Sequence, residues 1–282
     1  MKWKIFFVFL LCSYALLIVP FTSYLRDRPL QIKLGYSPPP QVLKVLSAEH
    51  SATVASISVL RVLFYYGALL QATQDRQQVT PEYFNMYKTL QGASYLDPYN
   101  MDTYYFVQAS FTWGLGRINE VNALLTRGMQ YRTWDPWIPF YLGFNSAYFQ
   151  KKYQQAAPYM QRAAEISGNP LFAKLAARYF YESKQTDLGL AFLDTMIAGS
   201  ENRTVKRGYE LRRDALVAVQ SINQTILKYR ELFKREPDDL AALVASGLLS
   251  QIPADPYGGE FYLDEDGVVR STSKFAASQT AR

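Results

Sequence analysis

The fold is decided by one stretch, Lys152-Tyr153-Gln154-Gln155-Ala156-Ala157, together with Met160 and Ala163 after it. Tyr153 and the residues three, seven and ten positions later fall on one face of an α-helix. Ala156 and Ala163 stand where a small side chain lets another helix come close. The same offsets recur in three other places, which begin at Tyr83, Ile118 and Thr186. We therefore predict four helices that pack through equivalent faces.

The four copies of this pattern are 35, 35 and 33 residues apart. Their later positions are mostly apolar or small: Met86, Leu90, Ala93, Val121, Leu125, Gly128, Gly189, Leu193 and Met196. A period near 34 is typical of helix-turn-helix units that stack into a solenoid, because each unit buries its face against the next. The sequence predicts an all-α solenoid of helical hairpins over residues 47–200. Scaffolds of this type usually bind proteins and carry out no chemistry.

Two segments resemble the tetratricopeptide repeat family. The first is Leu115-Gly116-Arg117-Ile118-Asn119-Glu120-Val121, which is similar to the family's turn between helix A and helix B. The second is Tyr141-Leu142-Gly143 with the alanines between 156 and 164, which is similar to the Leu-Gly pair of helix A and the small positions of helix B. The resemblance covers residues 80–200 and implies a membrane-anchored bacterial repeat protein that binds other proteins.

The proline positions support this resemblance, whereas other positions depart from it. Pro98, Pro136 and Pro170 fall near the proline that ends a repeat in the family, since proline cannot continue a helix. The helix A tryptophan of the family is replaced here by Tyr105, Phe140 or Ala173. The first helix B alanine is replaced by Gly189 in the fourth repeat. The fourth repeat is the most degenerate.

Composition excludes several kinds of active site. The 282 residues are 49% hydrophobic and 15% aromatic, and the formal net charge is +6, well short of a nucleic-acid footprint. Cys12 is the single cysteine and His50 the single histidine, which excludes an internal disulfide and argues against histidine-based triads or metal sites. We find no phosphate-binding loop and no nucleophile elbow. We therefore predict no enzyme, no cofactor and no metal.

The amino terminus reads as a membrane anchor over residues 1–28. Residues 5–25 carry no charge, and about 20 apolar residues span a bilayer core. A cleaved signal peptide would need small residues before the cut, and a lipoprotein a small residue before Cys12, where Leu11 stands. Charge around the span narrowly favours a cytoplasmic tail and a body in the bacterial periplasm, at the inner membrane.

A second apolar stretch, residues 51–72, leaves two readings open. It could be another span, which would put both ends of the protein on one side and the repeats in the cytoplasm. Arg61 at its centre costs about 3 kcal/mol on insertion scales, so we favour helix A of the first repeat. Residues 29–46, with Gly35-Tyr36-Ser37-Pro38-Pro39-Pro40-Gln41, form a stiff spacer that would lift the body off the membrane.

Past residue 200 the period fades. Residues 201–250 read as one or two charged helices and a further one, which would cap the stack with a polar face. The tail, residues 251–282, changes to strand spacing, and Asp266-Gly267 between two β-prone runs predicts a hairpin. The tail resembles that of some bacterial membrane-anchored repeat proteins and, faintly, a calcium-binding loop of type II secretion pseudopilins. Asp264, Glu265 and Asp266 lack the spacing of an EF-hand, so we expect an exposed turn.

Partner-binding residues follow from the family's concave groove, which helix A residues line. The register assigns to that groove Phe106, Trp113, Tyr141, Asn145, Lys174, Arg178 and Tyr181. Asn145, Lys174 and Arg178 could hold an anionic group of a peptide by charge-assisted hydrogen bonds. Alternatively, the cations are a solvated helix face and the aromatic residues pack the stack.

We therefore favour a membrane-anchored scaffold or adaptor that binds a protein partner of an envelope assembly. The competing hypotheses are an envelope enzyme or enzyme subunit that acts on a glycan within a superhelix, and the two-span protein with cytoplasmic repeats.

Overall fold

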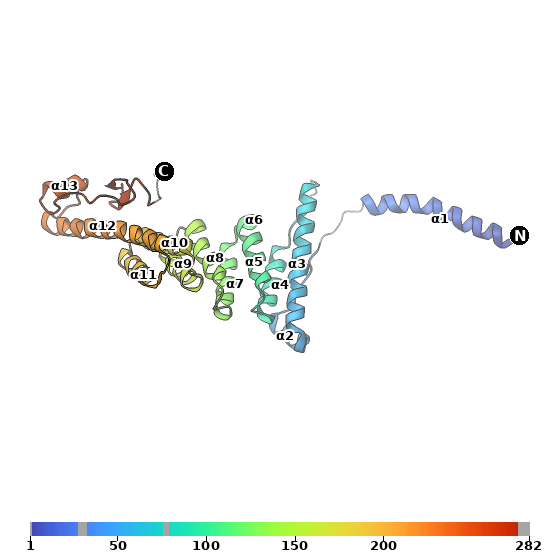
Figure 1. Ribbon diagram of the computed structural model, residues 1–282. Helices are drawn as coiled ribbons and strands as arrows, with labels where there is room; N and C mark the ends of the chain where they lie inside the picture. The colour runs from blue at the N-terminus through green and yellow to red at the C-terminus, as the bar shows by residue number, and fades with distance from the viewer. Residues whose placement is uncertain (1, 28–32, 76–78, 276–282) are drawn as a thin grey trace.

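The computed structural model describes residues 2–27, 33–75 and 79–275. These residues are mostly helical, as predicted, with a small two-stranded sheet near the C-terminal end (Figure 1). The α-helices are α1 (Lys2–Asp27), α2 (Pro40–Ser47), α3 (Ser51–Gln74), α4 (Tyr83–Leu96), α5 (Met101–Val107), α6 (Trp113–Leu115), α7 (Ile118–Tyr131), α8 (Trp137–Phe144), α9 (Tyr153–Ser167), α10 (Pro170–Glu182), α11 (Thr186–Gly199), α12 (Arg203–Phe233) and α13 (Leu240–Ala245). The shorter elements are the 3-10 turn η1 (Ala48–His50), the π-helical turns η2 (Gln108–Thr112) and η3 (Asn145–Phe149), and the strands β1 (Phe261–Leu263) and β2 (Val269–Ser271).

Four helices confirm the predicted helix starts and the predicted buried faces. The helices α4, α7, α9 and α11 begin at Tyr83, Ile118, Tyr153 and Thr186, the aligned first residues of the pattern. The positions three, seven and ten residues later are buried in every case except Met196, which is half-buried. Each helix therefore buries the face that its sequence pattern marks.

Glycines of this pattern stand where neighbouring helices approach most closely. A Cβ atom on Gly128 would lie 2.8 Å from the ring of Tyr104, and one on Gly189 would lie 3.0 Å from the Cβ of Phe180. Real Cβ atoms essentially never come as close as the first distance, and the second is tighter than most real Cβ contacts, so a larger residue at either position would force its neighbours to shift. The sequence pattern therefore indicates where neighbouring helices approach closely, as well as which side of each helix is buried.

The backbone repeats even where the side chains do not. Gly116, Lys151 and Lys184 each stand two residues before α7, α9 or α11, and their φ angles are 63°, 56° and 60°. This left-handed conformation is the one that glycine adopts freely and that costs other residues roughly 1–2 kcal/mol. The two lysines therefore make the same turn that the sequence marks clearly only at Gly116.

The helices pack mainly on their neighbours in the chain. Contacts join α3 to α4, α7 to α8, α8 to α9, α9 to α10, α10 to α11, and α11 to α12. Figure 1 shows these helices following one another in chain order across the body. Within the described residues, one hydrophobic cluster runs from Leu34 to Leu142 and a second from Ala147 to Phe275.

The two apolar segments of the sequence differ in their surroundings. The described side chains of α1 are almost all exposed, and Phe9–Ser23 is a short apolar helical segment within it. The stretch Pro40–Gln74 is long and apolar enough to cross a membrane, and 33% of its most apolar 18-residue segment is buried in the body. That stretch bends at η1, where Ala48 has a φ of 46°, and α3 beyond the bend packs on α4.

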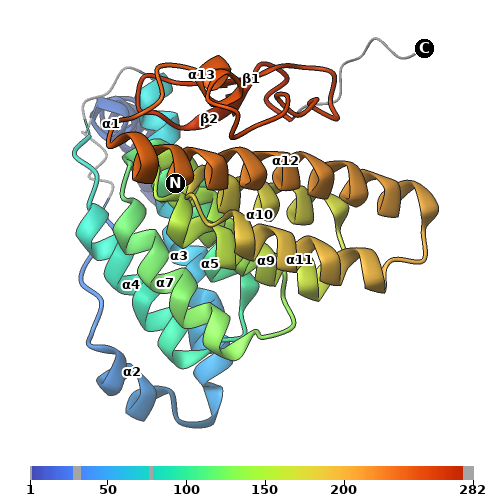
Figure 2. The same ribbon diagram turned by 90° about the vertical axis from the view of Figure 1, so that its left-hand side faces the viewer.

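The C-terminal region folds back on the body. α12 is one unbroken helix of 31 residues, and the side chain of Asn202 caps it by accepting hydrogen bonds from the amides of Thr204 and Val205. The predicted hairpin is confirmed: β1 and β2 pair antiparallel around a turn in which Gly267 has a φ of 67°. In Figure 2 this tail lies along α12, on the side away from α11.

Candidate partner-binding face

Three successive helical segments turn one side to solvent. These are α5 with η2 and α6, α8 with η3, and α10. The exposed side chains are Asp102, Tyr105, Ala109 and Trp113 in the first segment, Trp137 and Tyr148 in the second, and Leu171, Lys174 and Arg178 in the third. We call each of these sets a stripe. Trp113 contacts the rings of Tyr148 and Phe149, and Trp137 contacts the buried ring of Phe172 in α10, so these segments pack side by side. We call their exposed side the open face.

The N-terminal two thirds of the open face is aromatic. Trp113, Trp137 and Tyr148 are 59%, 50% and 52% exposed, respectively. Beneath them the rings of Phe144 and Phe149 touch Trp113, with the Phe149 centroid 5.0 Å away. Half-exposed rings that rest on other rings offer a large contact area and lose little conformational entropy when they bind.

The aromatic contacts continue from α8 to α10. Phe144 stacks on Tyr148 with centroids 5.2 Å apart, and Phe140 stacks on Phe172 of α10 at 4.8 Å. Tyr141 lies half-buried among these residues, and burial, followed by the nearby Tyr105 and Asp135, raises the pKa of its phenol.

Asn145, predicted to bind a partner, lies beneath this surface. It is completely buried, and its amide exchanges two hydrogen bonds with Gln108 at 3.0 and 2.9 Å. Its amide nitrogen also donates to the side-chain oxygen of Asn122 at 2.9 Å. This amide cluster joins η2, η3 and α7, so Asn145 holds the helices together and is not available to a partner in this structure.

The other predicted aromatic residues divide between surface and interior. Trp113 is exposed on the open face. Phe106 is half-buried and packs edge-on against Tyr66 of α3, with centroids 5.7 Å apart. Of the predicted aromatic set, Trp113 therefore presents the most surface to a partner.

Lys174 and Arg178 form a basic border on α10. Both are exposed, and Lys174 reaches Gly208 of α12. Arg178 is 56% exposed and stands 3.9 Å from the carboxylate of Glu182, the limit of an ion pair. A guanidinium at this distance in solvent gains little from its partner, so it can bind another anion at little cost.

Tyr181, the last predicted partner residue, is occupied by the protein's own tail. It is 7% exposed, and its hydroxyl donates a hydrogen bond to the carbonyl oxygen of Val269 in β2. Burial raises the pKa of this phenol to about 12, and Arg270 opposes the shift. Tyr181 is therefore not exposed to a partner here, and the open face ends at this residue.

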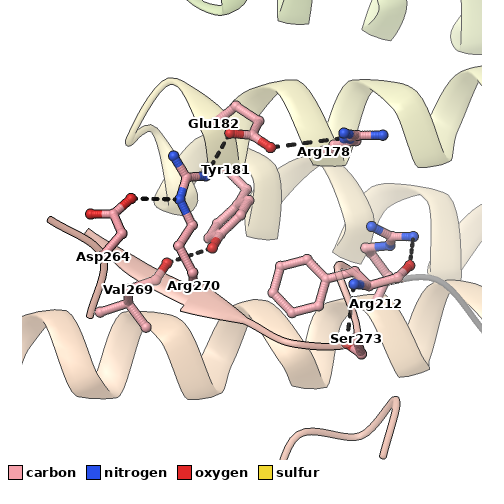
Figure 3. A network of polar contacts seen from close by, with 9 residues as sticks. Arg178, Tyr181, Glu182, Arg212, Asp264, Val269, Arg270 and Ser273 are labelled. Carbon is pink, nitrogen blue, oxygen red and sulfur yellow. Dashed lines mark hydrogen bonds and ion pairs between the residues drawn. The ribbon is translucent and has the colours of Figure 1, made fainter. Parts of the chain in front are cut away.

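A network of polar contacts fixes the tail at that edge (Figure 3). Arg270 bridges Glu182 of α10 at 2.6 Å and Asp264 of the hairpin turn at 3.0 Å. Arg212 of α12 is buried and donates to the carbonyl oxygen of Phe275 at 2.8 Å, with the rings of Tyr257 and Phe275 beside it. We call these contacts the tail clasp; they make the tail part of the folded body.

The acidic turn of the tail has a structural role. The carboxylate of Asp264 accepts hydrogen bonds from the amides of Asp266 and Val268 and pairs with Arg270. Burial works to raise the pKa of Asp264, but Val268 and Arg270 outweigh it, and the net shift is downward. Among the described residues, no three of the His, Cys, Asp and Glu side chains gather closely enough to hold a metal ion.

No protein-family model, no curated protein and no solved structure matches the chain.

Tyr148 of the open face was missed in the sequence, although a signal existed. Tyr148 follows Trp113 by 35 residues, the same interval that separates the helix starts. Trp137 stands four residues before Tyr141, on the same side of a helix. Extending the repeat period from Trp113 would have found Tyr148.

Proposed function

We propose that this protein is a membrane-anchored helical-repeat scaffold of tetratricopeptide type that binds another protein through the open face. The observation that carries the proposal is the recurrence of one helix start, one buried face and one left-handed turn at intervals near 35 residues. Repeats of this kind stack into a solenoid, since each hairpin buries its apolar face only against its neighbours. We assign the protein no catalytic role.

We infer that α1, and not α3, is the membrane span. The 26 residues of α1 give a helix of about 39 Å, longer than the ~30 Å bilayer core. Its described apolar residues are exposed on all sides, which suits hydrocarbon better than water. If α3 entered the bilayer, Val62, Tyr65 and Leu69 would have to leave their contacts in the body.

The folded body then lies on the side of the membrane that the chain reaches after the C-terminal end of α1. Lys2 and Lys4 with the amino terminus stand before the span, and Arg26 and Arg28, offset by Asp27, stand after it. This charge balance favours a short cytoplasmic tail and a periplasmic body at the bacterial inner membrane. An enzymatic reporter fused after Arg282, active in only one compartment, would test this orientation.

The open face suggests the chemistry of the partner. Its exposed rings suit apolar or aromatic side chains, and Lys174 and Arg178 beside them suit carboxylates. We therefore expect a protein segment that combines apolar and acidic residues, from an assembly of the cell envelope.

Crosslinking in cells, followed by mass spectrometry of the captured proteins, tests this proposal. In the double variant Trp113→Ala and Tyr148→Ala we expect capture of the partner to fall at least tenfold, because two central aromatic anchors are removed. Trp134→Ala is the matched control: Trp134 is 58% exposed, stacks on Tyr99 and belongs to none of the three stripes. Equal capture by the double variant and the wild type would reject the open face as the binding site.

A further inference from the structure

The outer side of α3 is apolar and uncovered by any described residue. Ile57, Leu60, Phe64 and Leu70 are 51%, 48%, 71% and 50% exposed. The first three are three or four residues apart and so share one side of the helix. The opposite side of α3, which includes Val59 and Val62, is buried against the body. We call the exposed side the end face, because no repeat precedes α3 in the described body.

The chain leaves the body beside this end face. Leu34 is buried, and its carbonyl oxygen accepts a hydrogen bond of 3.1 Å from Nη2 of Arg61, the residue next to Leu60. The amide of Gly35 donates to Glu82 at 3.2 Å, so the segment is held from two sides. Six residues lie between Asp27, the end of α1, and Leu34, and the seven Cα–Cα steps that join these two residues span at most about 25 Å.

The charge of this region suits an anionic surface. Residues 33–74 contain three cations, Lys33, Lys44 and Arg61, and one acidic residue, Glu49. Anionic headgroups attract such cations near a bilayer. The stretch Pro40–Gln74 is also apolar enough, by composition, to cross a membrane.

We infer that the end face lies on the headgroup layer of the membrane that α1 crosses, with its apolar side chains inserted among anionic phospholipids. This inference rests on the proposed anchor, which brings α3 within reach of the bilayer. A helix that is apolar on its outer side and fixed to a folded body on the other lies in the interface and does not cross the core. The body is then held against the membrane by its first helix, not raised from it by the spacer.

The test uses the full-length protein in vesicles of phosphatidylcholine and phosphatidylglycerol, with a nitroxide spin label on one cysteine at a time. The native Cys12 reports on α1. Phe64→Cys, made with Cys12→Ser, reports on the end face. Leu232→Cys in the same background is the matched control, because Leu232 is 65% exposed at the far end of α12. Accessibility to oxygen and to a water-soluble nickel chelate is measured for each label.

We expect the Cys12 label to be accessible to oxygen and inaccessible to the nickel chelate. The Leu232→Cys label should be accessible to the nickel chelate. The Phe64→Cys label should be several-fold less accessible to nickel than the Leu232→Cys label, and this contrast should shrink in vesicles without phosphatidylglycerol. If Phe64→Cys is as open to nickel as Leu232→Cys while Cys12 is in lipid, the inference is overturned and the anchor remains. If Cys12 itself is in water, the anchor fails, and the inference with it.

A second copy of the chain could cover the end face instead. Labels at Phe64→Cys would then lie close together in pairs, and their spectra would broaden through spin–spin coupling. Broadening that disappears on dilution with unlabelled protein would assign the face to a dimer and overturn the inference. A Phe64→Cys spectrum that dilution leaves unchanged, together with shielding from nickel, supports the membrane surface.

Discussion

The two ends of the helical stack are finished in different ways. At the C-terminal end, α12 is covered by the protein's own tail, which the tail clasp fixes with charged and hydrogen-bonded contacts. At the N-terminal end, α3 presents Leu60 and Phe64 with nothing described over them. Terminal repeats in water need a polar outer surface. The difference indicates that the two ends meet different surroundings, and it agrees with our proposal that one of them faces lipid.

The largest effect is expected where the tail closes the stack. Tyr181→Ala should lower the free energy of unfolding by about 3–5 kcal/mol, because it removes a buried aromatic ring and its hydrogen bond to Val269. Denaturant unfolding measures this, and limited proteolysis should show faster cleavage in residues 251–275. Tyr105→Ala, at a tyrosine 60% exposed, is the control and should change stability by less than about 0.5 kcal/mol. If Tyr181→Ala lost as little stability as Tyr105→Ala, the tail would not be a structural part of this end.

The next effect separates the two sides of α3. Leu69→Ala should cost about 2–4 kcal/mol, whereas Leu70→Ala should cost less than about 0.5 kcal/mol in detergent solution. The two leucines are neighbours in the chain, but Leu69 is 6% exposed and Leu70 is 50% exposed. Thermal unfolding of the two variants makes the comparison. Equal and small effects would argue that α3 sits in the bilayer and not in the body.

The smallest effect concerns pH. The pKa of Asp264 is lowered in the folded protein, so its ion pair with Arg270 adds stability above the unfolded pKa near 4 and loses it as the pH falls through the lower folded value. We expect a loss below about 1 kcal/mol between pH 5 and pH 2, in the range of solvent-screened pairs. Asp264→Asn should be less stable at pH 7 and lack this part of the acid dependence. An identical pH profile in both proteins would remove Asp264 from the tail clasp.

The sequence predicted the helices well because their signal is local. A buried face repeats within one helix, and the small residues at Ala156 and Gly128 record the approach of the neighbouring helix. The burial of Asn145 could not be predicted in this way. The π-helical turns η2 and η3 interrupt the regular period close to it, so a helical projection no longer gives the direction of the side chains.

The tail clasp could not be predicted from the sequence, for a different reason. Arg270 and Glu182 are 88 residues apart, and so are Tyr181 and Val269. No periodic pattern relates positions that meet only because the tail reverses over α12. The hairpin itself was predictable from Asp266-Gly267, whereas its docking site was not.

The position of the tail has a consequence for the proposed binding site, because it limits the length of a partner segment that could lie on the open face. A partner segment that crosses α5, α8 and α10 covers two spacings between helices of about 10 Å each. In extended conformation that is about six residues. At Glu182 the segment meets Arg270 and the hairpin, and it must turn away from the surface. If the open face binds a partner as we propose, we expect it to recognise a short linear motif that ends where Arg270 and the hairpin lie.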